Sequence, residues 1–113
     1  MTPMLIHLED NSAFTASSAV GAPTSAQIAM TRSAGHTDTP VGGAGIWECT
    51  PGRFRRQIAQ SEYSYFIEGE GSFTPEDGEP VEFYAGDIIF FTSNSKGEWN
   101  IRKTVRKAYL ILS

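Results

Sequence analysis

The sequence predicts an all-β domain, folded as a closed barrel or sandwich of antiparallel strands. Short runs rich in aromatic and β-branched residues are separated by turns roughly every ten residues, which is typical of such folds. No window shows a sustained helical period, so we expect little helix. Aromatic residues make up 12% of the chain, which also favours a β-rich core.

The predicted elements follow one another along the chain. Residues 11–45 are rich in small and polar side chains, and turn formers in 35–45 predict a loop there. The Asp-Gly pair within 76–79 is a hairpin signal. The apolar run 87–91 suits a strand covered on both faces. Strands are expected at 26–32, 45–50, 54–59, 61–69, 72–74, 80–84, 87–91, 98–102 and 104–112, and a further one is possible at 4–8.

Composition limits the classes of partner. A chain of 113 residues makes one domain with a modest core. Its net charge of −4 disfavours nucleic acid and anionic membrane. No apolar run approaches the roughly 20 residues of a membrane span, and the N-terminus lacks a basic and apolar secretion signal. Cys49 has no second cysteine to pair with, so we expect a cytoplasmic protein in which Cys49 is a small buried residue.

The charged residues are segregated along the sequence. Between 57 and 95 every charged residue is acidic, whereas basic residues gather in 53–56 and 96–107. Two interpretations are open. The basic groups form an anion-binding rim, or acidic and basic strands pair across the surface.

Several segments together resemble a known family. Glu62, six residues and then Gly69 reproduce the second half of the first cupin motif, and Gly86-Asp87 looks like the start of the second. With GIWECTPG and VRKAY, these segments make residues 43–113 similar to small single-domain cupins that resemble the (S)-ureidoglycine aminohydrolase cupin domain. The resemblance implies a cupin jelly-roll barrel (double-stranded β-helix), usually a homodimer, with a ligand or metal site in its mouth. Residues 1–42 are then N-terminal strands and loops that complete the barrel of this one domain.

The sequence lacks the histidines with which cupins of this kind bind a metal ion. Cupins that hold metal use two His before the motif Glu and one His in the second motif. Arg56 and Ile58, or with longer spacing Arg55 and Gln57, occupy the first two positions, and Gly97 occupies the third. His7 and His36 lie outside both motifs. We therefore expect no metal site and no cofactor, and a divalent ion such as manganese is disfavoured.

Strand alternation assigns faces around the motif Glu. If Glu62 points into the barrel, Ser64 and Phe66 follow it. The outward row is then Tyr63, Tyr65 and Ile67, which is too apolar for open water. Either a second subunit or the N-terminal strands of the same chain should cover that row.

The same count places Arg56 and Ile58 inside the barrel, with Arg56 within reach of Glu62. The pair is either structural or presents a donor fork and an acceptor to a small polar ligand. Trp99 and Trp47 form either an apolar wall for that ligand or part of the core. The predicted ligand-binding residues are therefore Arg56, Ile58, Glu62, Ser64, Trp99 and Trp47. Elsewhere we expect Glu48 and Lys107 to be surface ion-pair residues, and Phe90 and Phe91 to be core.

Three functions compete. The first is a metal-free cupin that binds a small polar molecule in the barrel mouth. The second is an enzyme: the resemblance implies metal-dependent hydrolysis of a ureido compound, with Glu62 as one ligand, and a metal-free isomerase with Glu62 as general base is also conceivable. The third is a structural module whose outer strands form the dimer.

Overall fold

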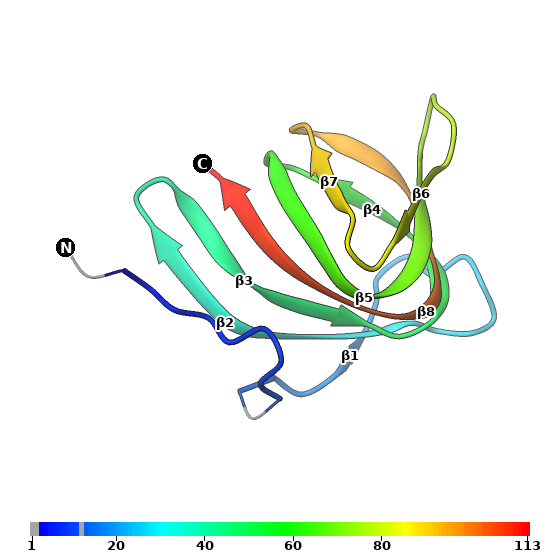
Figure 1. Cartoon of the computed structure of the whole chain (residues 1–113). Helices are drawn as coiled ribbons and strands as arrows, with labels where there is room; N and C mark the ends of the chain where they lie inside the picture. The colour runs from blue at the N-terminus through cyan, green and yellow to red at the C-terminus, as the bar shows by residue number, and fades with distance from the viewer. Residues whose placement is uncertain (1–2, 12) are drawn as a thin grey trace.

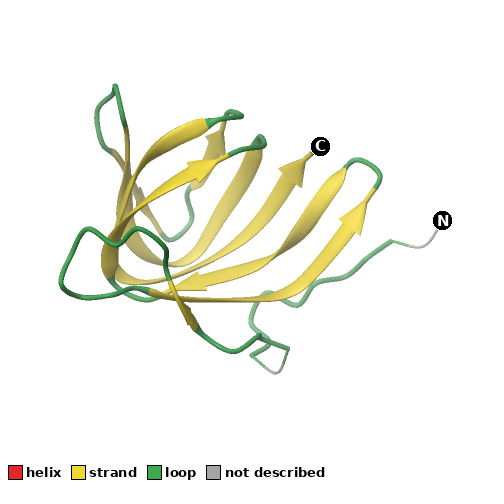
Figure 2. Cartoon of the chain, turned by 180° about the vertical axis from the view of Figure 1, so that it is seen from behind, coloured by secondary structure: helices red, strands yellow, loops and turns green. Residues whose placement is uncertain are grey.

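The computed structural model describes residues 3–11 and 13–113, which form eight strands and no helix (Figures 1 and 2). The predicted all-β class is therefore confirmed. No helix in the described ranges has the length and hydropathy needed to cross a membrane. The strands are β1 Ser18–Ala19, β2 Met30–Thr39, β3 Gly42–Cys49, β4 Gly52–Ile58, β5 Glu62–Pro75, β6 Val81–Tyr84, β7 Ile88–Phe91 and β8 Ser95–Leu112.

All the pairings between these strands are antiparallel, and they curl the sheet into a barrel. The order is β1-β2-β3-β8-β5-β6, while β4 also pairs with β8 and β7 with β5. The long strand β8 holds the barrel together because its first half pairs with β4 and its second half with β3. Along its length it also pairs with β5. Figure 1 shows these strands curving around a common interior.

The predicted loop at 35–45 is wrong. Residues 30–39 and 42–49 form a hairpin whose turn is Pro40–Val41. The glycines in this stretch were interpreted as turn formers, but in the structure they lie within strands and prevent steric clashes. A Cβ on Gly45 would lie 2.5 Å from the Tyr109 hydroxyl. The strand expected at 26–32 begins only at Met30, and residues 4–8 form no strand.

Two predicted strand breaks are absent. Residues 61–69 and 72–74 belong to one strand, β5, and residues 98–102 and 104–112 belong to β8. Gly69 lies inside β5 at φ +91, and a Cβ there would lie 2.3 Å from the Thr104 carbonyl oxygen. Gly69 therefore does not end the strand. It lies where the β5–β8 register shifts and the two backbones approach too closely for a side chain.

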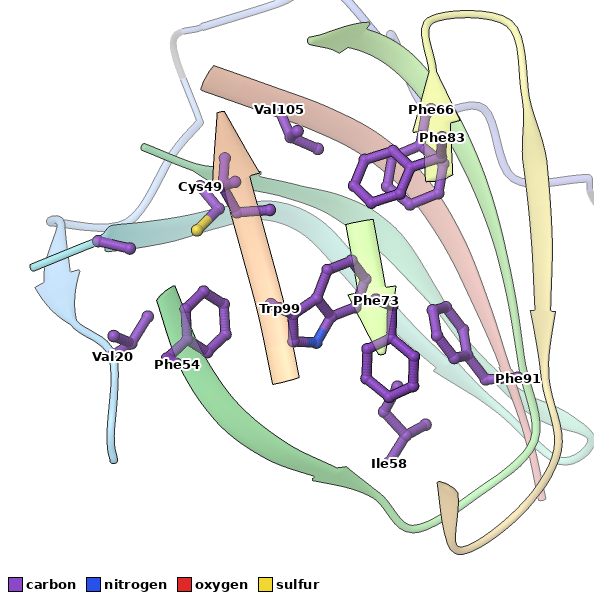
Figure 3. Close-up of a cluster of buried hydrophobic side chains, with 12 residues drawn as sticks. Val20, Cys49, Phe54, Ile58, Phe66, Phe73, Phe83, Phe91, Trp99 and Val105 are labelled. Atoms are coloured by element: carbon purple, nitrogen blue, oxygen red, sulfur yellow. The ribbon is translucent and has the colours of Figure 1, made fainter. Parts of the chain in front are cut away.

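An aromatic cluster fills the barrel (Figure 3). Trp99 is buried at its centre, with Phe73 5.2 Å and Phe91 5.5 Å away between ring centroids. Phe66 stacks on Phe83 at 4.0 Å. The expected inward positions of Phe66 and Phe91 are confirmed, and so is the burial of Cys49.

The N-terminal segment covers only part of the outer face. It is held by Arg106, which donates to the Leu8 carbonyl and to Asn11, and whose guanidinium lies 5.1 Å from the Phe14 ring centroid. It does not reach the tyrosine row: Tyr63 and Tyr65 remain 47% and 42% exposed. Cover of that row by the chain's own N-terminal strands is therefore wrong.

Strand β7 is not covered on both faces, as its apolar run predicted. Ile88 and Phe90 lie on the outer face and are 63% and 47% exposed, so the expected core position of Phe90 is wrong. Phe90 stacks on Tyr63 at 4.6 Å instead. We call the exposed set the outer patch; it consists of Tyr63, Tyr65, Ile88, Phe90 and Leu110.

Candidate functional site

A pocket of about 250 Å³ opens inside the barrel, where strands β2, β3, β4, β5 and β8 present inward side chains. It contains five of the six predicted ligand-binding residues. We call it the barrel pocket; it is lined by Ser33, Trp47, Arg56, Ile58, Glu62, Trp99, Lys107, Tyr109 and Ile111.

Glu62 points inward, as predicted. Strand alternation carries it there together with Ser64 and Phe66, which are fully buried two and four residues later. The Glu62 carboxylate accepts a hydrogen bond from the Ser64 hydroxyl at 2.8 Å and one from Lys107 Nζ at 2.7 Å. Ser64 is not among the residues that line the pocket; its hydroxyl donates to the Glu62 carboxylate and supports it.

Lys107 is the residue that the sequence interpretation misplaced. Expected on the surface, its side chain is only 7% exposed, and it is the ion-pair partner of Glu62. Its ammonium lies 4.8 Å from the Trp47 ring centroid and 5.3 Å from that of Trp99. Burial lowers the pKa of Lys107, and the neighbouring Glu62 charge opposes that shift.

Arg56 also points inward, but it does not pair with Glu62 as expected. Its guanidinium carbon lies 5.2 Å from the Phe54 ring centroid and 6.0 Å from that of Trp47. The position opposite Arg56 on β8 is Gly97, so the missing side chain leaves room for the guanidinium. Burial lowers the pKa of Arg56, and the negative charge of Glu62 opposes the shift.

Trp99 and Trp47 both pack in or against the core and both line the pocket. Trp99 is part of the core and lines the pocket; Trp47 is half-buried and packs beside it at 5.8 Å between centroids. Figure 3 places the Trp99 ring nitrogen between Phe54 and Phe73, on the side where Ile58 lies. Within the described residues, this nitrogen is the one buried side-chain N or O atom without a hydrogen-bond partner.

Tyr109 connects the pocket to a polar group at the surface. Its hydroxyl lies 2.7 Å from His36 Nδ1, and His36 Nε2 lies 2.8 Å from Asp38. Burial raises the pKa of Tyr109, with smaller contributions from the Glu62 and Asp38 charges. This group was missed because residues 35–45 were expected to be a loop.

The donors present do not fit a divalent metal of the manganese type. The described part of the chain contains no cluster of three or more His, Cys, Asp or Glu side chains able to hold an ion. In the pocket, Glu62 is already bonded to Lys107 and Ser64, and no imidazole accompanies it. Cys49 is an inert buried thiol, since burial raises its pKa to about 12.

Most residues of the basic groups pair with acidic side chains from other strands or turns, as the second interpretation of the charge pattern expected. Arg55 bonds Glu76 at 2.7 Å, and Arg102 bonds Glu82 at 2.7 Å. Glu48 pairs with Arg32 at 2.8 Å and with the buried Arg106 at 2.7 Å. These pairs neutralise most of the basic residues that could have formed an anion-binding rim. Among the described residues, Arg56 has no such acidic partner.

A wider depression of about 550 Å³ lies at the turns near 76–77 and 92–96. Its wall combines residues of β5, β6, β7 and β8 with residues of the two turns, and the charged side chains in it, Glu76, Asp77 and Lys96, are exposed. The barrel pocket is smaller, but it contains the buried charges and the inward aromatic residues. Perturbed charged groups in a concave site are the stronger functional signal.

Comparison with known proteins confirms that the chain is a small cupin. The family described as the EutQ-like cupin domain matches residues 37–109. No curated protein matches the chain.

Solved structures share the fold. The Clostridium difficile EutQ protein superposes with a TM-score of 0.66 at 23% identity, over 74% of this chain and 68% of that one. A putative ethanolamine utilization protein Q from Salmonella typhimurium LT2 gives 0.63 at 22% identity, over 76% and 70%. A Pseudomonas syringae protein of unknown function from the DUF861 family gives 0.75 at 24% identity, over 89% of this chain and 45% of that one.

Proposed function

This chain belongs to the EutQ-like cupin domain family, and from that premise we propose that it binds a small polar molecule in the barrel pocket without a metal ion. The observation that carries the proposal is the inward Glu62–Lys107 ion pair. Burying two charges is costly, and replacing such a pair by apolar residues is often neutral or stabilising. A charged pair facing a pocket, rather than a dry core, is what recognition of a polar ligand requires.

The chain carries its own reporter for this binding. Its two tryptophans, Trp47 and Trp99, both line the barrel pocket, so intrinsic fluorescence responds to occupancy. We expect a hit from a library of small acids, amides, alcohols and ureides to change the fluorescence. At a concentration one hundred times its Kd, the ligand should raise Tm by about 10 °C. Ile58→Phe, which fills the pocket, should abolish both responses.

The proposal fails if no compound binds, or if hits bind Ile58→Phe as well as they bind the unmodified protein. Glu62→Gln keeps the shape of the side chain and removes the charge, so a polar ligand that contacts the carboxylate should bind it more weakly. Manganese added alone should leave Tm unchanged.

The alternative is an enzyme of the ureidoglycine aminohydrolase type. The His36–Tyr109 contact is the feature that favours any catalytic interpretation, because it joins an imidazole to the hydroxyl of a tyrosine that lines the pocket. A tightly held stoichiometric metal in protein purified without chelator would support this alternative over metal-free binding.

We also propose that a second copy of the chain covers the outer patch, giving a homodimer. The five members are large apolar side chains on adjacent strands, and the N-terminal segment leaves them open. Phe90→Glu should convert a dimer of the 12.3 kDa chain to monomer in sedimentation velocity. Val81→Glu, at an exposed site on β6 outside the patch, should leave the dimer intact. An unmodified protein that sediments as a monomer would contradict the proposal.

A further inference from the structure

Arg56 is exceptional among the arginines of the chain. Arg32, Arg53, Arg55, Arg102 and Arg106 each have a carboxylate partner within 4.0 Å. Within residues 3–11 and 13–113, Arg56 has no ion pair and no hydrogen bond, although it is half-buried and lines the barrel pocket. Its donor fork is supported only by the ring faces of Phe54 and Trp47. A guanidinium held in this way is free for a planar acceptor.

Trp99, which also lines the barrel pocket, carries a second donor without an acceptor among the described residues. The Trp99 indole N–H is buried and has no partner in the described structure. The register places Trp99 and Arg56 two residues apart along the inner face, because Phe54 lies opposite Trp99 and Gly97 lies opposite Arg56. A buried donor without an acceptor is unfavourable, so a ligand atom that accepts from it would stabilise the complex.

The charges of the pocket favour an anion. Lys107 and Glu62 neutralise each other at 2.7 Å, which leaves the single positive charge of Arg56. The nearby Cys49 thiol is neutral, and the Tyr109 hydroxyl is engaged by His36. The pocket therefore has one net positive charge and two donors that need acceptors.

Resting on the proposed function, we infer that the ligand is a small monocarboxylate whose carboxylate lies between the Arg56 guanidinium and the Trp99 indole N–H. The rest of the molecule lies toward Ile58 and Ile111, and a hydroxyl or amino group on it faces Glu62. The pocket of about 250 Å³ corresponds to about eight water volumes of about 30 Å³ each, which sets the size at roughly eight non-hydrogen atoms. A single net charge and a planar fork suit a carboxylate better than a phosphate dianion.

The experiment compares acids with their uncharged amides. Monocarboxylates of three to six carbons, plain and hydroxylated, are each titrated beside the matching primary amide, with inorganic phosphate as a third probe. Calorimetry and tryptophan fluorescence give Kd. We expect at least one acid to bind about tenfold or more tightly than its amide, which is the effect of one charge-assisted bond. Phosphate should bind more weakly than that acid.

Variants then locate the contact. Arg56→Met should weaken acid binding at least about tenfold and leave amide binding nearly unchanged, and Arg56→Lys should recover only part of the loss. Trp99→Phe replaces the indole by a smaller phenyl ring without the N–H and should weaken binding of the acid several-fold. Arg55→Met is the matched control, because Arg55 lies on the outer face of the same strand, half exposed and paired with Glu76, and should change nothing.

The outcomes separate this inference from the proposed function. Equal binding of acid and amide, or an acid Kd that Arg56→Met leaves unchanged, would overturn the carboxylate inference while ligand binding in the pocket stands. Tighter binding of phosphate than of every acid would also overturn it. If neither acids nor amides bind, the carboxylate inference is wrong, and the proposed function is then tested by the alcohols and ureides of the wider library. The acid-to-amide ratio of the unmodified protein decides the matter even if a variant fails to fold.

Discussion

Replacing Lys107 by Met should lower the free energy of unfolding by about 3–5 kcal/mol, the usual cost of removing one member of a buried ion pair. The Glu62 side chain is only 13% exposed and would be left with the Ser64 hydroxyl alone. Urea unfolding at neutral pH measures the loss. Lys103→Met is the control: Lys103 pairs with Glu70 but is 75% exposed, so its loss should stay within about 0.5 kcal/mol.

The pH dependence of the same variant gives a second readout. The folded-state pKa of Lys107 lies below its ordinary value of 10.5, so the unfolded chain binds more protons between the lowered pKa and 10.5. The contribution of Lys107 to stability therefore rises with pH in that window. The gap between the unmodified protein and Lys107→Met should widen toward pH 10.5. A gap that narrows would contradict the burial of Lys107.

Replacing Trp99 by Ala should cost about 3–5 kcal/mol, because a large buried aromatic side chain is lost and leaves a cavity. Trp99 lies within 6.5 Å, between ring centroids, of Trp47, Phe54, Phe66, Phe73, Phe83 and Phe91. A small domain has only about 5–15 kcal/mol of stability in total, so the variant should unfold at much lower urea concentration. Circular dichroism follows the transition without relying on the lost tryptophan.

Tyr84→Ala is the matched control for Trp99→Ala. Tyr84 is an aromatic residue on the short strand β6 and is 52% exposed, so its removal should change the unfolding free energy by less than about 1 kcal/mol. If the two variants lost equal stability, Trp99 would not be the centre of the core.

The sequence predicted side-chain orientation correctly where the two-residue alternation of a β-strand continues without a break. Counting by twos from Glu62 placed Ser64 and Phe66 inside and the tyrosines outside, because β5 keeps its alternation over that stretch. The same count on β4 placed Arg56 and Ile58 in the pocket. The cupin resemblance depended on Glu62, Gly69 and Gly86-Asp87 with their flanking segments, and the family match and the solved structures confirm the fold.

The failures have physical causes. The hairpin at 30–49 was hidden because glycines that make room for Tyr109 and other neighbours resemble turn formers in sequence. Lys107 was placed on the surface because lysine is rarely buried, although it shares the parity of the inward Trp99 along β8 and that signal was available. Arg56 was predicted as the partner of Glu62 because strand alternation turns it toward the same interior, but Lys107 reaches that interior from β8 and forms the ion pair.

The assignment of that partner is the claim on which the account of the pocket depends: Lys107 neutralises Glu62, and Arg56 stays free. Two double-mutant cycles test it directly, one joining Glu62→Gln with Lys107→Met and one joining Glu62→Gln with Arg56→Met. We predict a coupling energy of about 1 kcal/mol or more for Glu62 with Lys107, and less than about 0.5 kcal/mol for Glu62 with Arg56. A larger coupling with Arg56 than with Lys107 would contradict the account.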